Sequence, residues 1–156
     1  MELKELSQKI RDAFPEAIQE EQANAIVIKK ESLLPVAKFL KEGETQFTNC
    51  HCVSGLDRKD KQLEAIYWLY SFKHRFMLTL KVILPRENPE VESVSGLWKS
   101  ANWLERETFD LFGITFLHHP DPRRILNPDE WTDWPLRKDF DRPDFYRLPP
   151  VQGLKG

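Results

Sequence analysis

The residues with the greatest capacity for chemistry lie in one stretch of the sequence, between positions 105 and 139. Carboxylates and guanidinium groups stand there among prolines and aromatic residues, without a glycine-rich phosphate loop. Its characteristic members are Glu105, Arg106, Glu107, Asp110, Gly113, His119, Pro120, Arg123, Arg124, Pro135, Leu136, Arg137, Lys138 and Asp139. Glu105 and Glu107 do not make an acid–base pair, because residues two apart on a helix point in different directions. The stretch instead predicts an assembly surface, since arginine and tryptophan are enriched at the centres of stable interfaces.

The arginines of this stretch have two uses that the sequence leaves open. Each guanidinium is a planar fork of donors suited to carboxylates and backbone carbonyls. Arg106, Arg123 and Arg124 can pair within the chain and tie a C-terminal arm to the preceding helix, or they can pair with another subunit. The acidic residues available within the chain are Glu105, Glu107, Asp110 and Asp121. For pairs between subunits, replacing Arg106, Arg123 or Arg137 by alanine is predicted to weaken association by about 2–5 kcal/mol.

Cys50, His51 and Cys52 form a second group of side chains that could bind a metal. One segment that supplies three ligands makes a poor structural zinc site without a fourth ligand. A disulfide between residues two apart in a strand would be strained. The sequence therefore favours two small cysteines on one buried face of a strand. A stand-alone metal or redox protein that uses these three residues is the alternative.

Two adjacent histidines, His118 and His119, precede Pro120. Neighbouring residues in an extended segment point apart, and no carboxylate or further histidine follows at a ligand spacing. We expect His119 to shape the turn by hydrogen bonding. No catalytic, cofactor-binding or metal-binding residue is predicted in the chain.

The composition predicts one domain with a single core. The chain has 156 residues, of which 40% are hydrophobic and 31% charged, and its net charge is -2. Without an excess of positive charge, binding to nucleic acid or anionic lipid is not expected. The most apolar stretch, residues 76–84, is far shorter than the roughly 20 residues of a membrane-spanning helix. No secretory signal is recognisable, so we expect a cytosolic protein that reaches a membrane only through partners.

Hydrophobic spacing predicts the elements of the first half of the chain. Helices are expected at 3–14 and 33–40, and strands at 24–30, 46–54, 63–70 and 76–83. Ser32 is expected to cap the second helix, and Gly43 to take the left-handed position after it. Residues 63–70 also fit a helical period, but their aromatic side chains favour a strand paired antiparallel with 76–83.

Two helices are predicted after residue 90. Ser93 can cap a short helix through Trp98, and Ser100 can cap a longer helix over 101–112 that Gly113 ends. The predicted apolar face of the longer helix consists of Ala101, Leu104, Thr108, Leu111 and Phe112. Arg106, Glu107 and Asp110 fall largely outside that face, where they are available for contacts.

An extended arm is predicted at the C-terminal end. Seven of the eleven prolines lie in residues 120–150, and each proline restricts itself and the residue before it away from helix. Only residues 128–131, after a possible Asn127 cap, suggest a helical turn. Because its tryptophans have little local core to enter, we expect the arm from residue 120 to residue 156 to be poorly ordered in the isolated chain.

The motifs of the second half resemble those of a known family. The order E-R-E-x-x-D-L-F-G-I-x-F-x-x-H-P-D-x-R-R-I-L at 105–126, followed by P-L-R-K-D-F at 135–140, resembles the 30-kDa-type, or C-type, subunit of respiratory complex I. This complex is the proton-pumping NADH:quinone oxidoreductase, and its cyanobacterial and plastid relatives share the motifs. The resemblance implies an α+β fold: a two-layer domain with a mixed sheet over 1–119 and an extended, proline-rich arm over 120–156 that packs on a partner subunit.

The resemblance also implies a role. Subunits of this kind are non-catalytic core components of the peripheral arm, so the chain is expected to hold no cofactor, with NADH, iron–sulfur clusters and quinone elsewhere in the complex. Its expected partners are the homologue of the D-type subunit, which is hydrogenase-large-subunit-like, and other peripheral-arm subunits on the cytoplasmic side of the membrane. The electron donor stays open. The equivalent subunit of an energy-converting membrane-bound hydrogenase is the alternative.

Overall fold

The computed structural model describes residues 2–58 and 61–141 of the chain. Its elements, in chain order, are α1 (Leu3–Ala13), β1 (Ile18–Gln22), β2 (Ala25–Ile28), the short 3-10 helix η1 (Lys30–Ser32), α2 (Leu33–Glu42), β3 (Asn49–Asp57), β4 (Gln62–Ser71), β5 (Phe76–Pro85), β6 (Glu90–Glu92), α3 (Lys99–Phe112) and β7 (Thr115–Leu117). Across these described ranges, no helix combines the length and the apolar character needed to span a bilayer.

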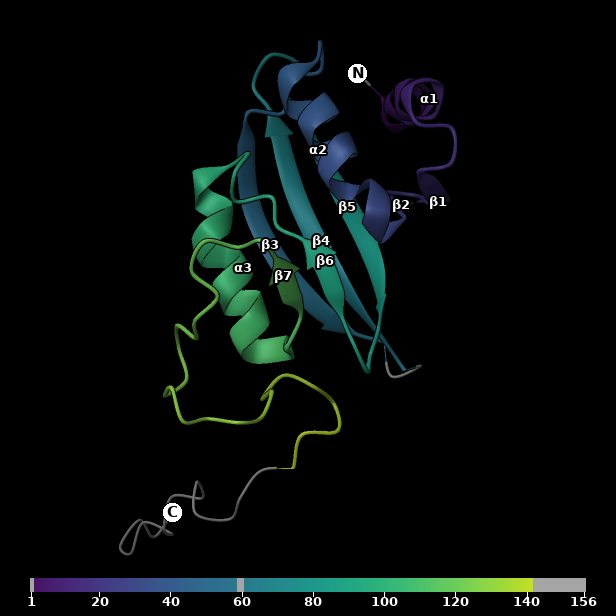
Figure 1. Cartoon of the computed structure of the whole chain (residues 1–156). Coiled ribbons are helices and arrows are strands. Elements are labelled where there is room, and N and C mark those ends of the chain that lie inside the picture. Colours follow the sequence, from purple (N-terminus) through teal and green to yellow (C-terminus); the bar gives the residue numbers. More distant parts are fainter. Residues whose placement is uncertain (1, 59–60, 142–156) are drawn as a thin grey trace, which may run out of the picture.

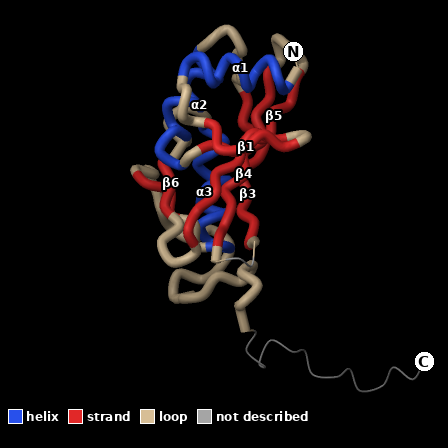
Figure 2. The backbone as a smooth tube through the Cα atoms, turned by 90° about the vertical axis from the view of Figure 1, so that its right-hand side faces the viewer, coloured by secondary structure: helices blue, strands red, loops and turns tan. Residues whose placement is uncertain are grey.

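A five-stranded mixed sheet forms one layer of the domain. Its strand order is β1-β2-β5-β4-β3, with β2 and β5 parallel and the other neighbouring pairs antiparallel. The helices lie on one face of this sheet, as Figures 1 and 2 show. The predicted α+β class, with two layers and a mixed sheet, is confirmed.

The central strands β4 and β5 build most of the core. In β5 every second residue from Leu78 to Leu84 is fully buried, and the residues between them are partly exposed. Every residue of β4 pairs with a residue of β5, so the strand predicted at 63–70 is confirmed over its helical alternative. Aliphatic residues that alternate at period two can bury only one face, and this face receives the helices.

α3 covers the edge strand of the sheet, β3. The hydroxyl of Ser100 donates to the carbonyl of Cys50 at 2.8 Å. The hydroxyl of Thr108 lies 3.2 Å from the carbonyl of Val53 and 2.9 Å from that of Leu104 in its own helix. Side-chain donors of the helix thus reach backbone carbonyls of a strand that has only one neighbouring strand. These two contacts fix the position of α3, whose far side then faces the C-terminal arm.

The helix starts differ from the predicted ones because the serines bind elsewhere. Ser32 belongs to η1, and no side-chain hydrogen bond caps α2. α3 begins at Lys99 without a side-chain cap, so Ser100 lies inside the helix, where its hydroxyl donates to β3. The segment after Ser93 is a turn and not a short helix. The Ser93 oxygen accepts the amide of Ser95 at 3.1 Å, and its hydroxyl donates to a carboxylate of α3.

Other departures concern Gly43 and three strands. Gly43 has φ -74° and ψ -171°, so it is extended and not left-handed. β1, β6 and β7 are absent from the sequence prediction. β6 and β7 have only three residues each and pair in parallel with one another. A strand of three residues is too short to show alternation, so its pairing depends on the tertiary fold.

Gly55 provides a test of the packing between α3 and the sheet. A Cβ atom there would lie 2.5 Å from the Phe112 ring, whereas one at Gly96 would have no neighbour within 4 Å. Gly55→Ala should therefore destabilise the domain by about 1–3 kcal/mol, because the helix must shift to relieve the overlap. Urea unfolding measures this loss. Gly96→Ala is the matched control, and equal stabilities of the two variants would contradict the packing described.

Candidate functional site

The arm lies beside α3, at the lower end of the domain in Figure 1. The structure describes its residues 120–141, and residues 142–156 of the predicted arm lie outside the described part. The described arm contains turns but neither a helix nor a strand, as the prolines predict. Its contacts show how the charged motif residues are used.

The Asp110 carboxylate on α3 binds backbone amides of the arm. Its Oδ2 accepts hydrogen bonds from the amides of Ile125 at 3.1 Å, Leu126 at 2.6 Å and Asn127 at 2.8 Å. Its Oδ1 accepts from Arg124 Nη1 at 2.7 Å and from the Asn127 side chain at 2.9 Å. Burial alone would raise the pKa of Asp110, but these donors together hold it well below its usual range. The charged carboxylate is thus the form that the arm binds.

The Arg106 guanidinium binds backbone carbonyls of the same part of the arm. Its Nε donates to the carbonyl of Arg123 and its Nη2 to the carbonyl of Arg124, both at 3.0 Å. Its Nη1 lies 3.2 Å from the Asp121 carboxylate, and the guanidinium lies over the Trp103 ring at 5.0 Å. The whole donor fork is therefore used within the chain, and a lysine would not reproduce it.

The P-L-R-K-D-F segment closes the C-terminus of α3. The amide of Leu136 donates to the carbonyl of Leu111 at 3.0 Å, and Arg137 Nε donates to the carbonyl of Phe112 at 2.7 Å. These two carbonyls belong to the last turn, which lacks partners inside the helix. Gly113 takes the left-handed conformation with φ +71°, and a Cβ there would lie 2.5 Å from Trp134. Its conformation and its lack of a side chain are both required.

An ion-pair network joins the end of the arm to the sheet. Arg86 bridges two carboxylates, Asp57 and Asp139, each at 2.6 Å. The second Asp57 oxygen accepts the backbone amide of Lys138 at 2.8 Å. Hydrogen bonds from Asp57 and Asp139 raise the pKa of Arg86 above its ordinary value. The arm is therefore fixed at three places: on the face of α3, at its C-terminus and at the end of β3.

Glu105 of α3 is fully buried. It accepts hydrogen bonds from the Ser93 hydroxyl at 2.5 Å and from the Val94 amide at 2.7 Å. His119 Nε2 lies 3.7 Å away. Burial raises the pKa of Glu105 to about 7, and the hydrogen bonds from Ser93 and Val94 offset part of that rise. A carboxyl group that titrates close to neutrality thus lies in the core.

His119 holds the first turn of the arm. Its Nδ1 accepts the amide of Asp121 at 3.0 Å, and its Nε2 lies 3.0 Å from the carbonyl of Asn102. The expectation that His119 shapes the turn by hydrogen bonding is confirmed. The exposed His118 instead pairs with Glu92 at 2.9 Å.

The structure corrects the predicted polar face of α3. Glu105, Arg106 and Asp110 are buried, although the helical spacing predicts Arg106 and Asp110 largely outside the packed face. The reason is that the arm covers the side of the helix that would otherwise be exposed. Glu107 remains exposed, and Arg123 is mostly exposed, with its guanidinium on Asp121 at 2.6 Å. Of the two uses that the sequence left open for Arg106, Arg123 and Arg124, the structure contains the pairing with acidic residues of the same chain.

The sequence analysis did not predict that several residues of the site hold the arm. Asp57 and Arg86 are far from the motif along the chain, and Asn127 was expected only as a helix cap. Trp134 packs edge-on against Phe109 with ring centroids 5.3 Å apart, so the arm does find local apolar contacts. Only the cluster of charge near residue 123 indicated that this arm has a fixed docking place.

The cysteine cluster does not form one buried face. A bulge between Cys50 and Cys52 shifts the register, so that Cys50 pairs with Leu69 and Cys52 with the adjacent Trp68. Cys50 is buried and Cys52 is half-buried, and burial raises the pKa of the Cys50 thiol to about 12. Within residues 2–58 and 61–141, no three histidine, cysteine or acidic side chains come together as metal ligands.

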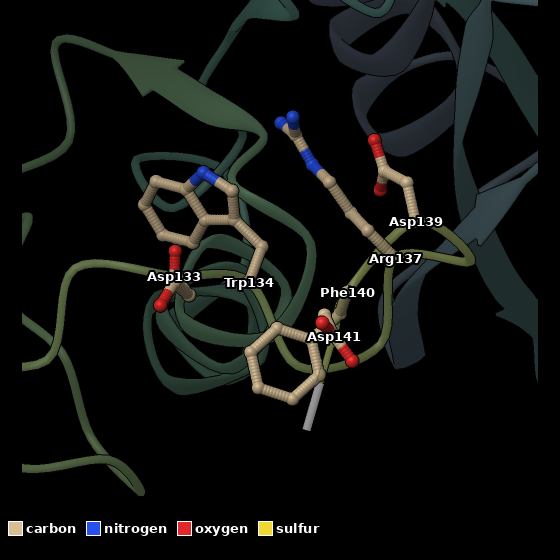
Figure 3. Close-up of a pocket in the computed structure, with 6 residues that line it drawn as sticks. All are labelled: Asp133, Trp134, Arg137, Asp139, Phe140 and Asp141. Carbon is tan, nitrogen blue, oxygen red and sulfur yellow. The ribbon is translucent and has the colours of Figure 1, made fainter. Parts of the chain in front are cut away.

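The outer side of the arm presents a hollow and apolar side chains. An open hollow of about 420 Å³, shown in Figure 3, is lined by Asp133, Trp134, Arg137, Asp139, Phe140 and Asp141. Leu126 and Leu136 are more than half exposed, and so is Trp103 on the adjoining part of α3. Asp110 and Arg106 are thus used to hold the arm, while the side chains of Leu126, Leu136 and Trp103 lie at the surface.

Comparison with known proteins finds similar subunits of respiratory-type dehydrogenases. Residues 26–146 match the family model described as "Respiratory-chain NADH dehydrogenase, 30 Kd subunit". The chain is 38% identical over 148 residues to the C-type subunit of F(420)H(2) dehydrogenase from Methanosarcina mazei, a match that covers 90% of this chain and 93% of the relative. It is 41% identical over 118 residues to the C-type subunit of NADH-quinone oxidoreductase from Geobacter sulfurreducens, covering 74% and 72%. A solved trypsin-resistant fragment of Nqo5 matches 78% of this chain and 99% of the fragment, with 28% identity and a TM-score of 0.63.

Removing the Asp110 carboxylate should release the arm. Asp110→Ala leaves the Arg124 guanidinium and three amides without their acceptor, so docking should weaken by about 3–5 kcal/mol. Hydrogen exchange of the amides of residues 125–127 measures the loss. Asp129→Ala, an exposed acid of the same arm, is the control. Equal protection in both variants would show that Asp110 does not anchor the arm.

Replacing Glu105 should remove one pH-dependent part of the stability. The folded pKa of about 7 lies above the ordinary 4.5, so the folded chain holds a proton that the unfolded chain releases between these values. The stability contributed by this proton is full below about pH 4.5 and is lost as pH rises through about 7, by up to roughly 3 kcal/mol.

Urea unfolding of the wild type and Glu105→Gln at a series of pH values tests this sign. The stability difference, wild type minus variant, should fall as pH rises through this window. Glu107→Gln, at an exposed position of the same helix, should give a flat difference. A flat difference for Glu105→Gln as well would contradict the assignment.

Proposed function

The chain belongs to the family of the 30 kDa subunit of respiratory-chain NADH dehydrogenase, and we propose that it acts in its complex as a scaffold without a catalytic centre. It is a subunit of a complex I-like, quinone-reducing oxidoreductase that couples electron transfer to proton translocation. The observation that supports the scaffold role is that charged residues of the motif bind groups of this same chain. The carboxylates of Asp110 and Glu105 and the guanidinium of Arg106 are occupied by the arm and the core.

In this proposal the surface offered to partner subunits contains the exposed apolar side chains of α3 and the arm. Trp103 is 60% exposed, Leu126 62% and Leu136 51%. Tryptophans that are held in place by a neighbouring group and surrounded by apolar side chains are typical centres of interfaces. Arg106 lies against one face of Trp103 and so restricts the ring before a partner binds. In this proposal the homologue of the D-type subunit and other peripheral-arm subunits pack against this surface.

The cofactors and the electron donor belong to other subunits in this proposal. The relatives carry names that differ in their donor, F(420)H(2) in one case and NADH in another, although their sequences resemble this chain to a similar degree. A subunit that only positions its neighbours has no need to change with the donor. NADH or another donor, the iron–sulfur clusters and quinone are therefore held elsewhere, in a complex on the cytoplasmic side of the membrane.

Variants of the outward residues test the scaffold role. Trp103→Ala combined with Leu136→Asp should raise the dissociation constant for the partner subunits by about 30-fold or more, equivalent to about 2 kcal/mol. The measurement is native-gel abundance of the complex and recovery of partners from membranes. Leu34→Asp, at an exposed leucine on α2, is the control and should assemble normally.

Turnover separates a scaffold from a catalytic part. Particles that still assemble with the double variant should keep nearly normal quinone-reductase turnover per bound cofactor. Full assembly with turnover reduced more than about tenfold, a loss of over about 1.4 kcal/mol of transition-state stabilisation, would mean that these residues act on the chemistry. Normal assembly with normal turnover would place the partner surface elsewhere.

A further inference from the structure

The first turn of the arm depends on a histidine whose ring nitrogens both bind backbone groups. The His119 side chain is only 2% exposed. Its Nδ1 faces the amide of Asp121, and its Nε2 faces the carbonyl of Asn102, both at 3.0 Å. An amide N–H only donates and a carbonyl oxygen only accepts. The backbone therefore fixes His119 as a neutral imidazole with its proton on Nε2.

We propose that His119 is a proton-operated latch of the arm, in which a proton on Nδ1 breaks the hydrogen bond from the Asp121 amide and loosens the arm on α3. A protonated Nδ1 is a donor, so it would face another donor at hydrogen-bond distance. The buried site offers the imidazolium no water in exchange. Opening of the turn at Asp121 relieves the conflict. This latch lies in the chain itself and goes beyond the scaffold role.

The charged groups around His119 make proton uptake feasible. From α3, the Glu105 carboxylate lies 3.7 Å from Nε2 and favours the imidazolium while it is charged, above its pKa of about 7. Asp121 of the arm also favours it, whereas Arg106 of α3 and Arg123 of the arm, which both pair with Asp121, oppose it. Thr115 and Phe116, on β7 beside this group, carry no charge. While Glu105 is charged, the two carboxylates balance the two guanidinium groups, so no net charge opposes a proton at this site.

The other titratable groups near this site keep one charge state around neutrality. Burial raises the pKa of Cys50 on β3 to about 12 and that of Tyr67 on β4 well above its ordinary value, so both stay neutral. The pKa of Asp110 is held well below its usual range, so its grip on the arm does not respond directly. Glu105 does titrate, but its hydrogen bonds come from Ser93 and Val94, which precede α3 and do not belong to the arm.

Hydrogen exchange on the full chain tests the latch. Between about pH 8 and about pH 5, the range in which histidine ordinarily changes its charge, protection of the amides at 125–127 should fall at least about tenfold after correction for intrinsic exchange. Protection of β4 and β5 should stay constant and serves as the internal reference. His119→Asn keeps an acceptor for the Asp121 amide but cannot take up a proton, so its arm protection should not change with pH.

Two further variants assign the effect. His118→Asn removes an exposed histidine next to the latch and should behave as the wild type. Glu105→Gln removes the second titratable group beside the ring, so a loss of protection that is caused by His119 should persist in this variant. An arm protection in the wild type that does not change with pH, or the same loss in His119→Asn as in the wild type, would overturn the proposal.

A spectroscopic measurement covers the case in which His119→Asn fails to fold. The ring nitrogen chemical shifts of His119 in the unaltered protein should change together with the Asp121 amide as pH falls. An imidazole that stays neutral while the arm loosens would assign the release to another group and overturn the proposal.

Discussion

An extended segment with neither helix nor strand must find partners for its backbone groups outside itself, and in this domain one face of α3 supplies them. Asp110 takes three successive amides of the arm, and Arg106 takes two carbonyls just before them. The carboxylate can only accept and the guanidinium can only donate, so the arm has one register on the helix. Trp134, Leu136 and the closure of the helix C-terminus all follow from that register.

Burial makes this arrangement selective. A buried charge whose partner is removed is costly, whereas a fully paired one is close to neutral in its net contribution. Arg106 and Asp110 are four residues apart and could pair with one another on the helix surface. Each binds the arm instead. Asp121 of the arm pairs with Arg106, and Arg124 of the arm pairs with Asp110. The pairs therefore specify where the arm lies more than they stabilise the domain.

The sequence predicts what is local and misses what is distant. Alternation in β5, the aromatic side chains of β4, and the end of α3 at Gly113 are properties of short windows, and the structure contains them. Ser93 and Ser100 are of the residue type that caps helices, but their hydroxyls donate to acceptors on α3 and β3 that are distant in sequence and that no short window contains. No window of the sequence contains both Asp57 and Asp139, which share Arg86. The motif predicted the location of the site, and only the fold determined which way its charges face.

The closed edge of β3 restricts how neighbouring subunits can approach. An open sheet edge is a template on which another chain can add a strand. On β3, helix α3 occupies carbonyls of that edge through Ser100 and Thr108, and the arm reaches Asp57 at its end. At these positions an approaching subunit meets side chains and not free backbone. Its affinity then depends on the shape and chemistry of those side chains, which discriminate between partners far better than a strand edge that any extended peptide can join.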